Sequence, residues 1–201
     1  MIILTHNKGK PFYVTNSNVS FTGSLYFDRN NADSTCTFAA VDGSKVIFAE
    51  HTSFSNNYVW QSRGSLCIYS GSNVTFSTGG TEFIKNQGEG GSAIYAHSSY
   101  LNFHGNVIIS ENVAYRGGGL SLYGGAIMII NPNTYINFTG NTALHRGGAI
   151  YVHDKDYYFG RYGCTQCFFW WPEDESQSTM AEMYFQGNYA DGKKAITGFS
   201  T

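Results

Sequence analysis

The chain has 201 residues, a formal net charge of −2 and a pI near 6.3, so bulk charge does not attract it to nucleic acid or anionic lipid. No run approaches the roughly 18 apolar residues of a membrane-spanning helix. We therefore expect one domain, residues 1–201, with no nucleic-acid partner and no membrane insertion by this chain itself.

Three kinds of short segment recur along the chain, and the first is an alternating apolar segment. Alternation with a period of two predicts a strand, because successive side chains of a strand point to opposite faces. These segments contain Val19 and Phe21, Val46 and Phe48, Val74 and Phe76, and Leu101 and Phe103. No window shows a sustained helical stripe, so we expect almost no helix.

The second recurring segment is a Phe-x-x-Asn step. It occurs at Phe27 with Asn30, Phe54 with Asn57, Phe83 with Asn86, Phe138 with Asn141 and Phe185 with Asn188, and Ile109 replaces the phenylalanine before Asn112. The leading positions 27, 54, 83, 109 and 138 are 27, 29, 26 and 29 residues apart, about 28 on average, whereas the next interval is 47. A period of this size is typical of solenoids and related arrays, and the long interval indicates an insertion.

The third segment is a glycine-led apolar run after the asparagine: RGSLCIY, GGSAIYA, GGGLSLY and GGAIYV follow Asn57, Asn86, Asn112 and Asn141. Each unit thus holds three strand-like runs, which fits one coil of a parallel β-helix with strands about 4.8 Å apart. A propeller blade would need four strands and about 40 residues. We predict an all-β parallel β-helix (solenoid) of about five to six coils, with repeats at 17–152 and 183–196 and an insertion at 153–180.

The repeat positions also predict which side chains stack. Inward phenylalanines should form a column, and turn asparagines should form a ladder of amide hydrogen bonds, with the left-handed backbone of a sharp corner at the asparagine. We predict the ladder at Asn57, Asn86, Asn112 and Asn141. After the glycines we expect two inward columns, Leu66, Ala93, Leu120, Ala149 and Ile68, Tyr95, Leu122, Tyr151, with Cys67, Ile94, Ser121 and Ile150 facing outward or toward a corner.

The insertion concentrates aromatic side chains beside an acidic run. Long loops on repeat scaffolds often carry function, and exposed aromatics are frequent binding anchors. The binding candidates there are Phe168, Phe169, Trp170 and Trp171. Alternatively, this segment packs over the solenoid as a strand.

Cys164 and Cys167 form a single CxxC pair in the same insertion, and we name them as a disulfide candidate. With His145 or His153 they could complete a zinc site on paper, but one such pair is weak evidence for zinc. Cys36 and Cys67 lie within the repeats. We predict no metal site and no cofactor.

Three arginines before glycine runs, Arg63, Arg116 and Arg146, occupy equivalent repeat positions, with Glu89 near the corresponding place. They form either a solvated charged corner or a strip that binds an anionic glycan or another partner. Acid–base catalysis needs clustered carboxylates. Here Asp28, Asp42, Glu50, Glu82, Glu89 and Glu111 are scattered over different repeat positions, so we do not expect an enzyme.

Repeated FxxN steps paired with GGA and then Ile, Leu or Val resemble the repeats of polymorphic outer membrane proteins, best known from chlamydial surface autotransporters. Only residues 147–150 read as a full GGAI. The resemblance implies a right-handed parallel β-helix outside a cell, or at the outer membrane if the source is bacterial. It implies adhesion or surface architecture, with a protein or glycan of a host or neighbouring cell as partner.

We therefore predict a non-enzymatic extracellular or cell-surface repeat protein, adhesive or structural; the alternative is a β-helix enzyme acting on polysaccharides, as a lyase or glycosidase. The first four residues are too short for a signal-peptide core. Neither end of the sequence resembles a cap, so we expect a slice of a longer solenoid that could associate end to end.

Overall fold

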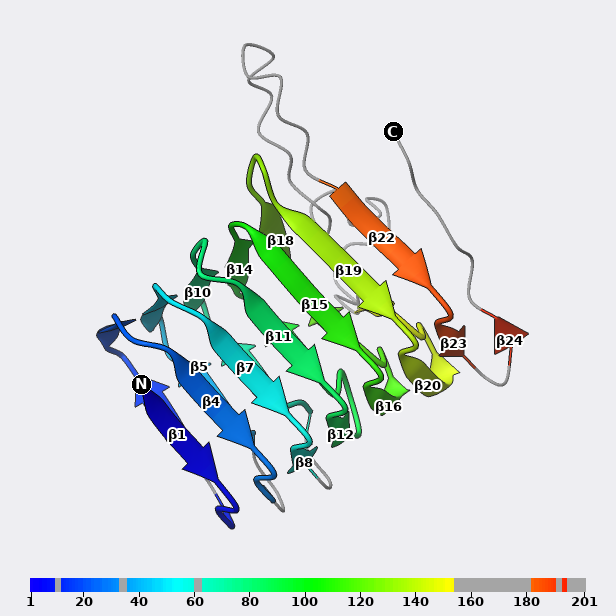
Figure 1. The fold of residues 1–201 in the computed structure, drawn as a ribbon, viewed down its shortest axis with the longest axis horizontal. Coiled ribbons are helices and arrows are strands. Elements are labelled where there is room, and N and C mark those ends of the chain that lie inside the picture. Colours follow the sequence, from blue (N-terminus) through cyan, green and yellow to red (C-terminus); the bar gives the residue numbers. More distant parts are fainter. Residues whose placement is uncertain (10–11, 33–35, 60–62, 154–181, 191–192, 195–201) are drawn as a thin grey trace.

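The computed structural model describes residues 1–9, 12–32, 36–59, 63–153, 182–190 and 193–194. All elements among them are strands, arranged in four sheets that we call A to D. Neighbouring strands within a sheet belong to successive coils and pair in parallel, except β23 and β24, which are antiparallel. Figure 1 shows the strands of sheet A side by side from β1 to β22.

The strand bounds follow the order of the coils. Sheet A contains β1 (Ile2–Thr5), β4 (Leu25–Asp28), β7 (Thr52–Ser55), β11 (Thr81–Ile84), β15 (Asn106–Ser110), β19 (Tyr135–Thr139) and β22 (Glu182–Gln186). Sheet B contains β8 (Tyr58–Val59), β12 (Gln87–Gly88), β16 (Val113–Arg116), β20 (Thr142–Arg146), β23 (Tyr189–Ala190) and β24 (Lys193–Lys194). Sheet C contains β2 (Phe12–Thr15), β5 (Phe38–Val41), β9 (Leu66–Tyr69), β13 (Ile94–His97), β17 (Leu120–Tyr123) and β21 (Ile150–His153). Sheet D contains β3 (Asn18–Phe21), β6 (Lys45–Phe48), β10 (Asn73–Phe76), β14 (Tyr100–Phe103) and β18 (Ile127–Ile130).

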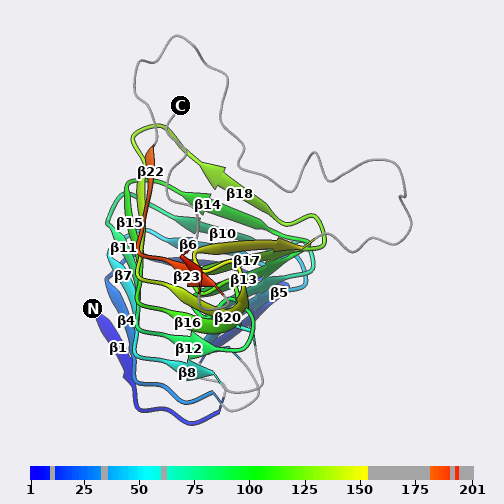
Figure 2. The ribbon, with the colours of Figure 1, turned by 90° about the vertical axis from the view of Figure 1, so that its right-hand side faces the viewer.

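The chain passes from sheet A through B, C and D and returns to A one coil further on, as a right-handed solenoid (Figure 2). The predicted all-β parallel solenoid with a spacing of about 28 residues is confirmed. The prediction of three strands per coil is wrong, because sheet B supplies a fourth. Its strands β8 and β12 are only two residues long, too short to show alternation in the sequence.

Two columns of stacked phenylalanines fill the interior. In the first, the ring centroids of Phe27, Phe54 and Phe83 lie 4.5 and 5.0 Å apart. In the second, the rings of Phe21, Phe48, Phe76 and Phe103 stack at 5.4, 4.8 and 5.4 Å. The columns meet edge to face, for example Phe76 against Phe83 at 5.8 Å. Offset-stacked and edge-to-face contacts are the favourable geometries for aromatic rings.

The asparagines of the FxxN steps lie in one buried column between sheets A and B. The Asn112 side chain donates to Oδ1 of Asn141 and to the carbonyl of Phe83, both at 2.9 Å. Its own Oδ1 accepts from the backbone and the side chain of Asn86, also at 2.9 Å. Every polar atom of the amide is therefore satisfied although the residue is fully buried.

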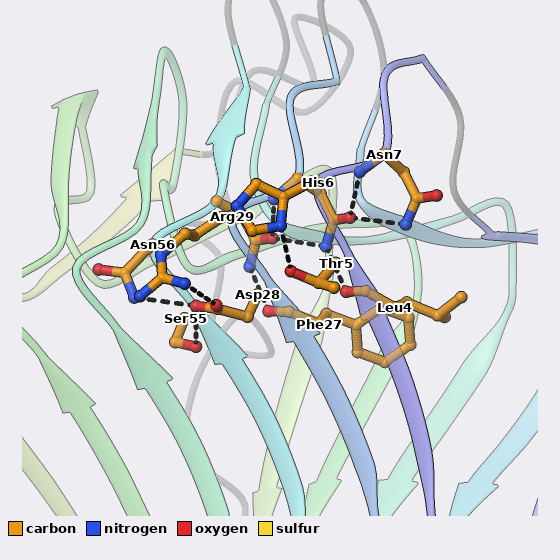
Figure 3. Close-up of polar contacts among 11 residues, drawn as sticks. Leu4, Thr5, His6, Asn7, Phe27, Asp28, Arg29, Ser55 and Asn56 are labelled. Carbon is orange, nitrogen blue, oxygen red and sulfur yellow. Dashed lines mark hydrogen bonds and ion pairs between the residues drawn. The ribbon is translucent and has the colours of Figure 1, made fainter.

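The same bonding pattern links the column from end to end: Asn7, Asn30, Asn57, Asn86, Asn112, Asn141 and Asn188. Figure 3 shows the start of this column at Asn7. The backbone N–H and the side-chain amide of Asn7 both donate to Oδ1 of Asn30. The phenylalanine carbonyl is part of the motif, because it accepts the ladder amide of the following coil. This explains the fixed spacing between phenylalanine and asparagine.

The left-handed residue of this corner is the one before the ladder asparagine, so the prediction that placed it at the asparagine is wrong. The φ angles there are positive: His6 56°, Arg29 50°, Asn56 53°, Lys85 56°, Glu111 55°, Gly140 64° and Gly187 60°. The ladder asparagine itself has a negative φ. Its backbone N–H and its side-chain amide both donate to the ladder asparagine of the next coil, as Asn57 does to Oδ1 of Asn86. A left-handed conformation costs a non-glycine residue roughly 1–2 kcal/mol, which the corner tolerates.

The predicted columns after the glycines are shifted by one residue in two of the coils. Leu66 pairs with Ile94, which pairs with Leu120, and all three belong to the core. Tyr95 and Tyr151 therefore align with the outward Cys67 and Ser121, whereas Ala96 and Val152 take the second inward column. Ala93 and Ala149 are buried at the glycine corner that precedes these strands. The outward positions of Cys67 and Ser121 agree with the prediction.

Replacing Asn112 with Ala should lower the free energy of unfolding by about 2–5 kcal/mol, because the Asn86 N–H and the Phe83 carbonyl each lose a buried partner worth roughly 1–3 kcal/mol. Chemical denaturation measures the loss. Asn106→Ala, at an exposed position of β15 in the same coil, is the control and should change the stability by less than about 0.5 kcal/mol. Equal effects of the two substitutions would contradict the ladder.

Candidate binding surface

The arginines predicted from the repeat lie where sheet B turns into sheet C. Arg63 precedes β9, and Arg116 ends β16. Gly90 lies in the coil between them and forms a parallel bridge with Arg116. Because Gly90 has no side chain, space remains between the two arginines. Arg146 pairs with Arg116 one coil further on and is exposed.

A cleft of about 360 Å³ occupies this space, within the usual range of small-ligand sites. Its lining consists of Arg63, Glu89, Gly90, Tyr95, Tyr115, Arg116 and Tyr123. Two of the three predicted arginines and Glu89 thus share one cleft, which Arg146 does not line. The three tyrosines were not among the predicted site residues.

Tyrosine rings form a column on the outer face of sheet C. The ring centroids of Tyr69 and Tyr95 are 5.6 Å apart, those of Tyr95 and Tyr123 are 4.9 Å apart, and those of Tyr123 and Tyr151 are 5.8 Å apart. Such spacings are typical of stabilising aromatic pairs. The recurrence of tyrosine in the apolar runs was the sequence signal for this column.

The two arginines lie against these rings. The Arg63 guanidinium carbon is 4.7 Å from the ring centroid of Tyr95 and 5.6 Å from that of Tyr69. The Arg116 guanidinium carbon is 5.5 Å from the ring of Tyr115 and 5.9 Å from that of Tyr151. Cation–π contacts of this kind fix the guanidinium planes. Hydrogen bonds with Tyr69 and Tyr123 engage part of the N–H groups of Arg63 and Arg116.

Burial and charge set the protonation of the cleft. Burial raises the pKa of Tyr95 to about 12, against the opposing effect of the Arg63 charge. Burial also raises the pKa of Tyr123, although its hydrogen bond with Arg116 acts in the opposite direction. The same hydrogen bond raises the pKa of Arg116. At neutral pH the phenols of Tyr95 and Tyr123 are therefore neutral and Arg116 keeps its positive charge.

A second groove, of about 440 Å³, continues from this cleft and shares Glu89 and Tyr115 with it. Its remaining lining is mostly apolar and comes from sheet B and its flanks: Tyr58, Val59, Gln87, Gly88, Val113, Ala114 and Leu144. Several of these side chains are exposed, with Leu144 at 64% and Tyr115 at 45%. Contiguous exposed apolar side chains on a surface often mark an interaction site.

The carboxylates of the repeats do not converge on this surface. Asp28 accepts hydrogen bonds from Ser55 and Asn56 at 2.9 Å (Figure 3), and these bonds lower its pKa although burial opposes the charge. Glu111 lies 3.6 Å from Lys85. Within the described ranges, no three His, Cys, Asp or Glu side chains gather closely enough to hold a metal ion.

The aromatic candidates Phe168, Phe169, Trp170 and Trp171 lie outside the described residues, and so do Cys164 and Cys167. Their roles in binding and in a disulfide stay predictions. The described residues contain no helix, and hence none that is long and apolar enough to cross a membrane.

A disulfide joins Cys36 and Cys67, whose Cα atoms are 5.9 Å apart. It lies in a small apolar cluster on the outer face of sheet C, beneath the tyrosine column, together with Ala39, Val41 and Tyr95. The bond links two successive coils, because Cys67 is one coil along from Ala39 in the sheet register. The arginine–tyrosine cleft is thus built over a covalent cross-link.

Replacing both Cys36 and Cys67 with Ser should lower the free energy of unfolding by about 2–4 kcal/mol, because the bond closes a separation of 31 residues in the unfolded chain. Denaturation with and without reductant measures this loss. Peptide mapping of the unreduced protein should recover Cys36 joined to Cys67. Cys36 or Cys67 joined to Cys164 or Cys167 would contradict the pairing.

Comparison with known proteins supports the resemblance found in the sequence. Residues 135–153 match a family model described as the Chlamydia polymorphic membrane protein (Chlamydia_PMP) repeat, and they span β19 to β21 with Asn141 and the GGAI segment. No curated protein and no solved structure matches the chain. The repeat family is not a family of enzymes. The repeat match and the β-solenoid together fit a Pmp-like surface repeat protein.

Proposed function

We propose that this chain is a non-enzymatic adhesive solenoid, displayed on a cell surface or at an outer membrane, that contacts a protein or glycan of a host or neighbouring cell. The observation that carries the proposal is the outward surface of sheets B and C. There, exposed aromatic and aliphatic side chains and two arginines line adjoining grooves. Aromatic and arginine side chains are enriched among the residues that dominate binding energy.

The rigidity of the scaffold supports this function. Tyr115 and Leu144 belong to adjacent strands whose coils are joined by the buried bonds of Asn112 with Asn141. The backbone of paired strands loses little further freedom on binding, so more of the contact energy remains for affinity. An extended, repeated surface also suits long partners such as glycans or neighbouring solenoids.

The disulfide supports an extracellular location. Disulfides persist in secreted and surface proteins and are rare in reducing compartments. Cys36 and Cys67 form such a bond inside the repeats themselves. The bond, the repeat match and the fold agree with display outside the cytoplasm, as expected for an autotransporter-like passenger.

The scattered carboxylates favour binding over polysaccharide cleavage. Glycoside cleavage commonly uses two carboxyl groups on opposite sides of one bond. Asp28 is engaged by neighbouring side chains, and Glu111 pairs with Lys85 at a different corner from the cleft. Glu89 is the one carboxylate among the described residues that line the two grooves of sheets B and C.

Beads coated with this protein should be retained on cultured cells well above uncoated beads. Tyr115→Ser/Leu144→Ser removes two exposed apolar side chains of the grooved surface and should reduce retention by roughly fivefold or more, since such contacts are worth about 1 kcal/mol or more. Tyr100→Ser/Ile108→Ser removes two exposed apolar side chains from sheets D and A and serves as the matched control.

Retention of both variants at the level of the unmodified protein would contradict binding through sheets B and C. Absence of retention by the unmodified protein would contradict adhesion itself. Chains that associate end to end, as predicted, could be mistaken for binding to cells. Light scattering must therefore show that the protein used for coating is monomeric. The insertion aromatics Phe168, Phe169, Trp170 and Trp171 stay a second proposed contact.

A further inference from the structure

We propose that the cleft between Arg63 and Arg116 is a subsite for an anionic sugar unit, one that carries a carboxylate or sulfate on a pyranose ring. The inference deepens the adhesive function proposed above by naming the chemistry of its ligand. It rests on three features of the cleft: two arginines without a carboxylate partner among the described residues, tyrosine side chains beside them and one carboxylate, Glu89, in the lining.

Arg63 and Arg116 have no carboxylate partner among the described residues. Among the described residues the ion pairs are Arg29 with Asp28 and Lys85 with Glu111, so neither Arg63 nor Arg116 has a carboxylate within 4.0 Å. The Nε–H of Arg116 is buried and donates to no acceptor among the described residues. Each guanidinium bonds one tyrosine hydroxyl, Tyr69 for Arg63 and Tyr123 for Arg116, and has five N–H donors in all. The remaining donors match the oxygens of a carboxylate or sulfate.

The aromatic rings orient the arginines. Arg63 lies over Tyr95, and Arg116 lies over Tyr115, so both guanidinium groups are held before a ligand arrives. Groups fixed in advance lose less entropy on binding. Tyr115, which is 45% exposed, also offers apolar ring surface and a hydroxyl in the cleft, a combination that suits the mixed apolar and hydroxylated surface of a sugar.

Glu89 distinguishes a sugar from other anions. Its ionised carboxylate can only accept hydrogen bonds, so it fits ligand hydroxyl groups and repels a second anionic group placed close to it. A sugar unit with one acidic group and several hydroxyls satisfies the arginines and Glu89 together. A run of consecutive acidic residues in a peptide would place charge against Glu89.

The adjoining groove extends the subsite along the solenoid. Because Glu89 and Tyr115 line both spaces, a ligand can pass from the cationic cleft onto the apolar surface of sheet B without leaving the protein. Gln87 supplies an amide there. The arrangement therefore fits an oligosaccharide with an anionic unit next to uncharged units.

The test measures binding of hyaluronan-derived and κ-carrageenan-derived oligosaccharides to the purified protein by calorimetry, at about 150 mM salt to screen long-range attraction. Both alternate uncharged units with units that carry one carboxylate or one sulfate. Gly90→Leu should weaken binding by roughly tenfold or more, because it fills the cleft at unchanged net charge. A side chain is accommodated there, since the nearest atom to an added Cβ is 3.9 Å away, on Tyr95. Gly23→Leu, whose added Cβ would lie 3.5 Å from Met1, is the matched control and should bind normally.

A second pair of variants separates specific contact from bulk charge. Arg63→Gln/Arg116→Gln should lose roughly tenfold or more in affinity, whereas Arg29→Gln/Lys45→Gln removes two exposed charges elsewhere and should lose less than about twofold. Equal losses in the two double variants would overturn the subsite. So would unweakened binding by Gly90→Leu, or equally tight binding of polyglutamate or uncharged dextran.

The outcomes also separate this inference from the adhesive function. If beads coated with Gly90→Leu are retained on cells normally while those coated with Tyr115→Ser/Leu144→Ser are not, the anionic subsite is overturned. The adhesive function would still stand. Glycan binding by the purified protein without cell retention would support the subsite and contradict adhesion. Thermal unfolding of every variant shows that the fold is intact.

Discussion

The buried asparagine ladder is the interaction on which the rest of the structure depends. Each ladder amide joins its own coil to the coil on either side, through the next asparagine and the phenylalanine carbonyl of the preceding coil. A buried amide that misses its partners is costly, so a coil that slipped in register would lose several hydrogen bonds at once. The ladder therefore fixes how each coil lies on its neighbour. The left-handed residues before each asparagine are tolerated because these bonds determine the corner.

Fixed register determines which side chains reach the two sides of each sheet. Because alternation has a period of two, a slip of one residue would exchange the interior phenylalanines with the solvent-facing side chains. With Phe54 stacked on Phe83 inside, Tyr95 is placed outside above the Cys36–Cys67 bond. The outer column then positions Arg63 and Arg116 in a shared cleft. The binding surface is thus a consequence of the same register that builds the core.

The sequence predicted the solenoid, its period and the ladder because one residue type recurs at a nearly constant interval. It did not predict the strand alignment after the glycines, because these runs differ in composition: Gly64 and Ser65 precede Leu66, whereas Gly90, Gly91, Ser92 and Ala93 precede Ile94. Tertiary pairing decides there which residue points inward. The prediction also put the left-handed residue at the ladder asparagine instead of one position earlier. Arg29, Lys85 and Glu111 occupy that earlier position, and their residue types do not indicate a left-handed backbone.

The site was predictable in part, for the same reason. Arg63 and Arg116 share a repeat position, so their alignment could be inferred from spacing, but the cleft depends on the missing side chain at Gly90 and on Tyr95 facing outward. Cys36 and Cys67 are separated by 31 residues, close to one period, which was a usable signal for a bond between adjacent coils. The predicted disulfide candidate was instead Cys164 with Cys167, which are three residues apart in the sequence.

Hydrogen exchange of asparagine side-chain amides, measured by NMR, tests the central claim most directly. The amide protons of Asn57, Asn86 and Asn112 donate inside the protein and are fully buried, whereas Asn106 is exposed. Because exchange requires opening of these bonds, the three ladder amides should exchange about 100-fold or more slowly than that of Asn106, corresponding to an opening free energy of roughly 2.8 kcal/mol or more. Exchange of the ladder amides at the rate of Asn106 would contradict a buried ladder that joins the coils.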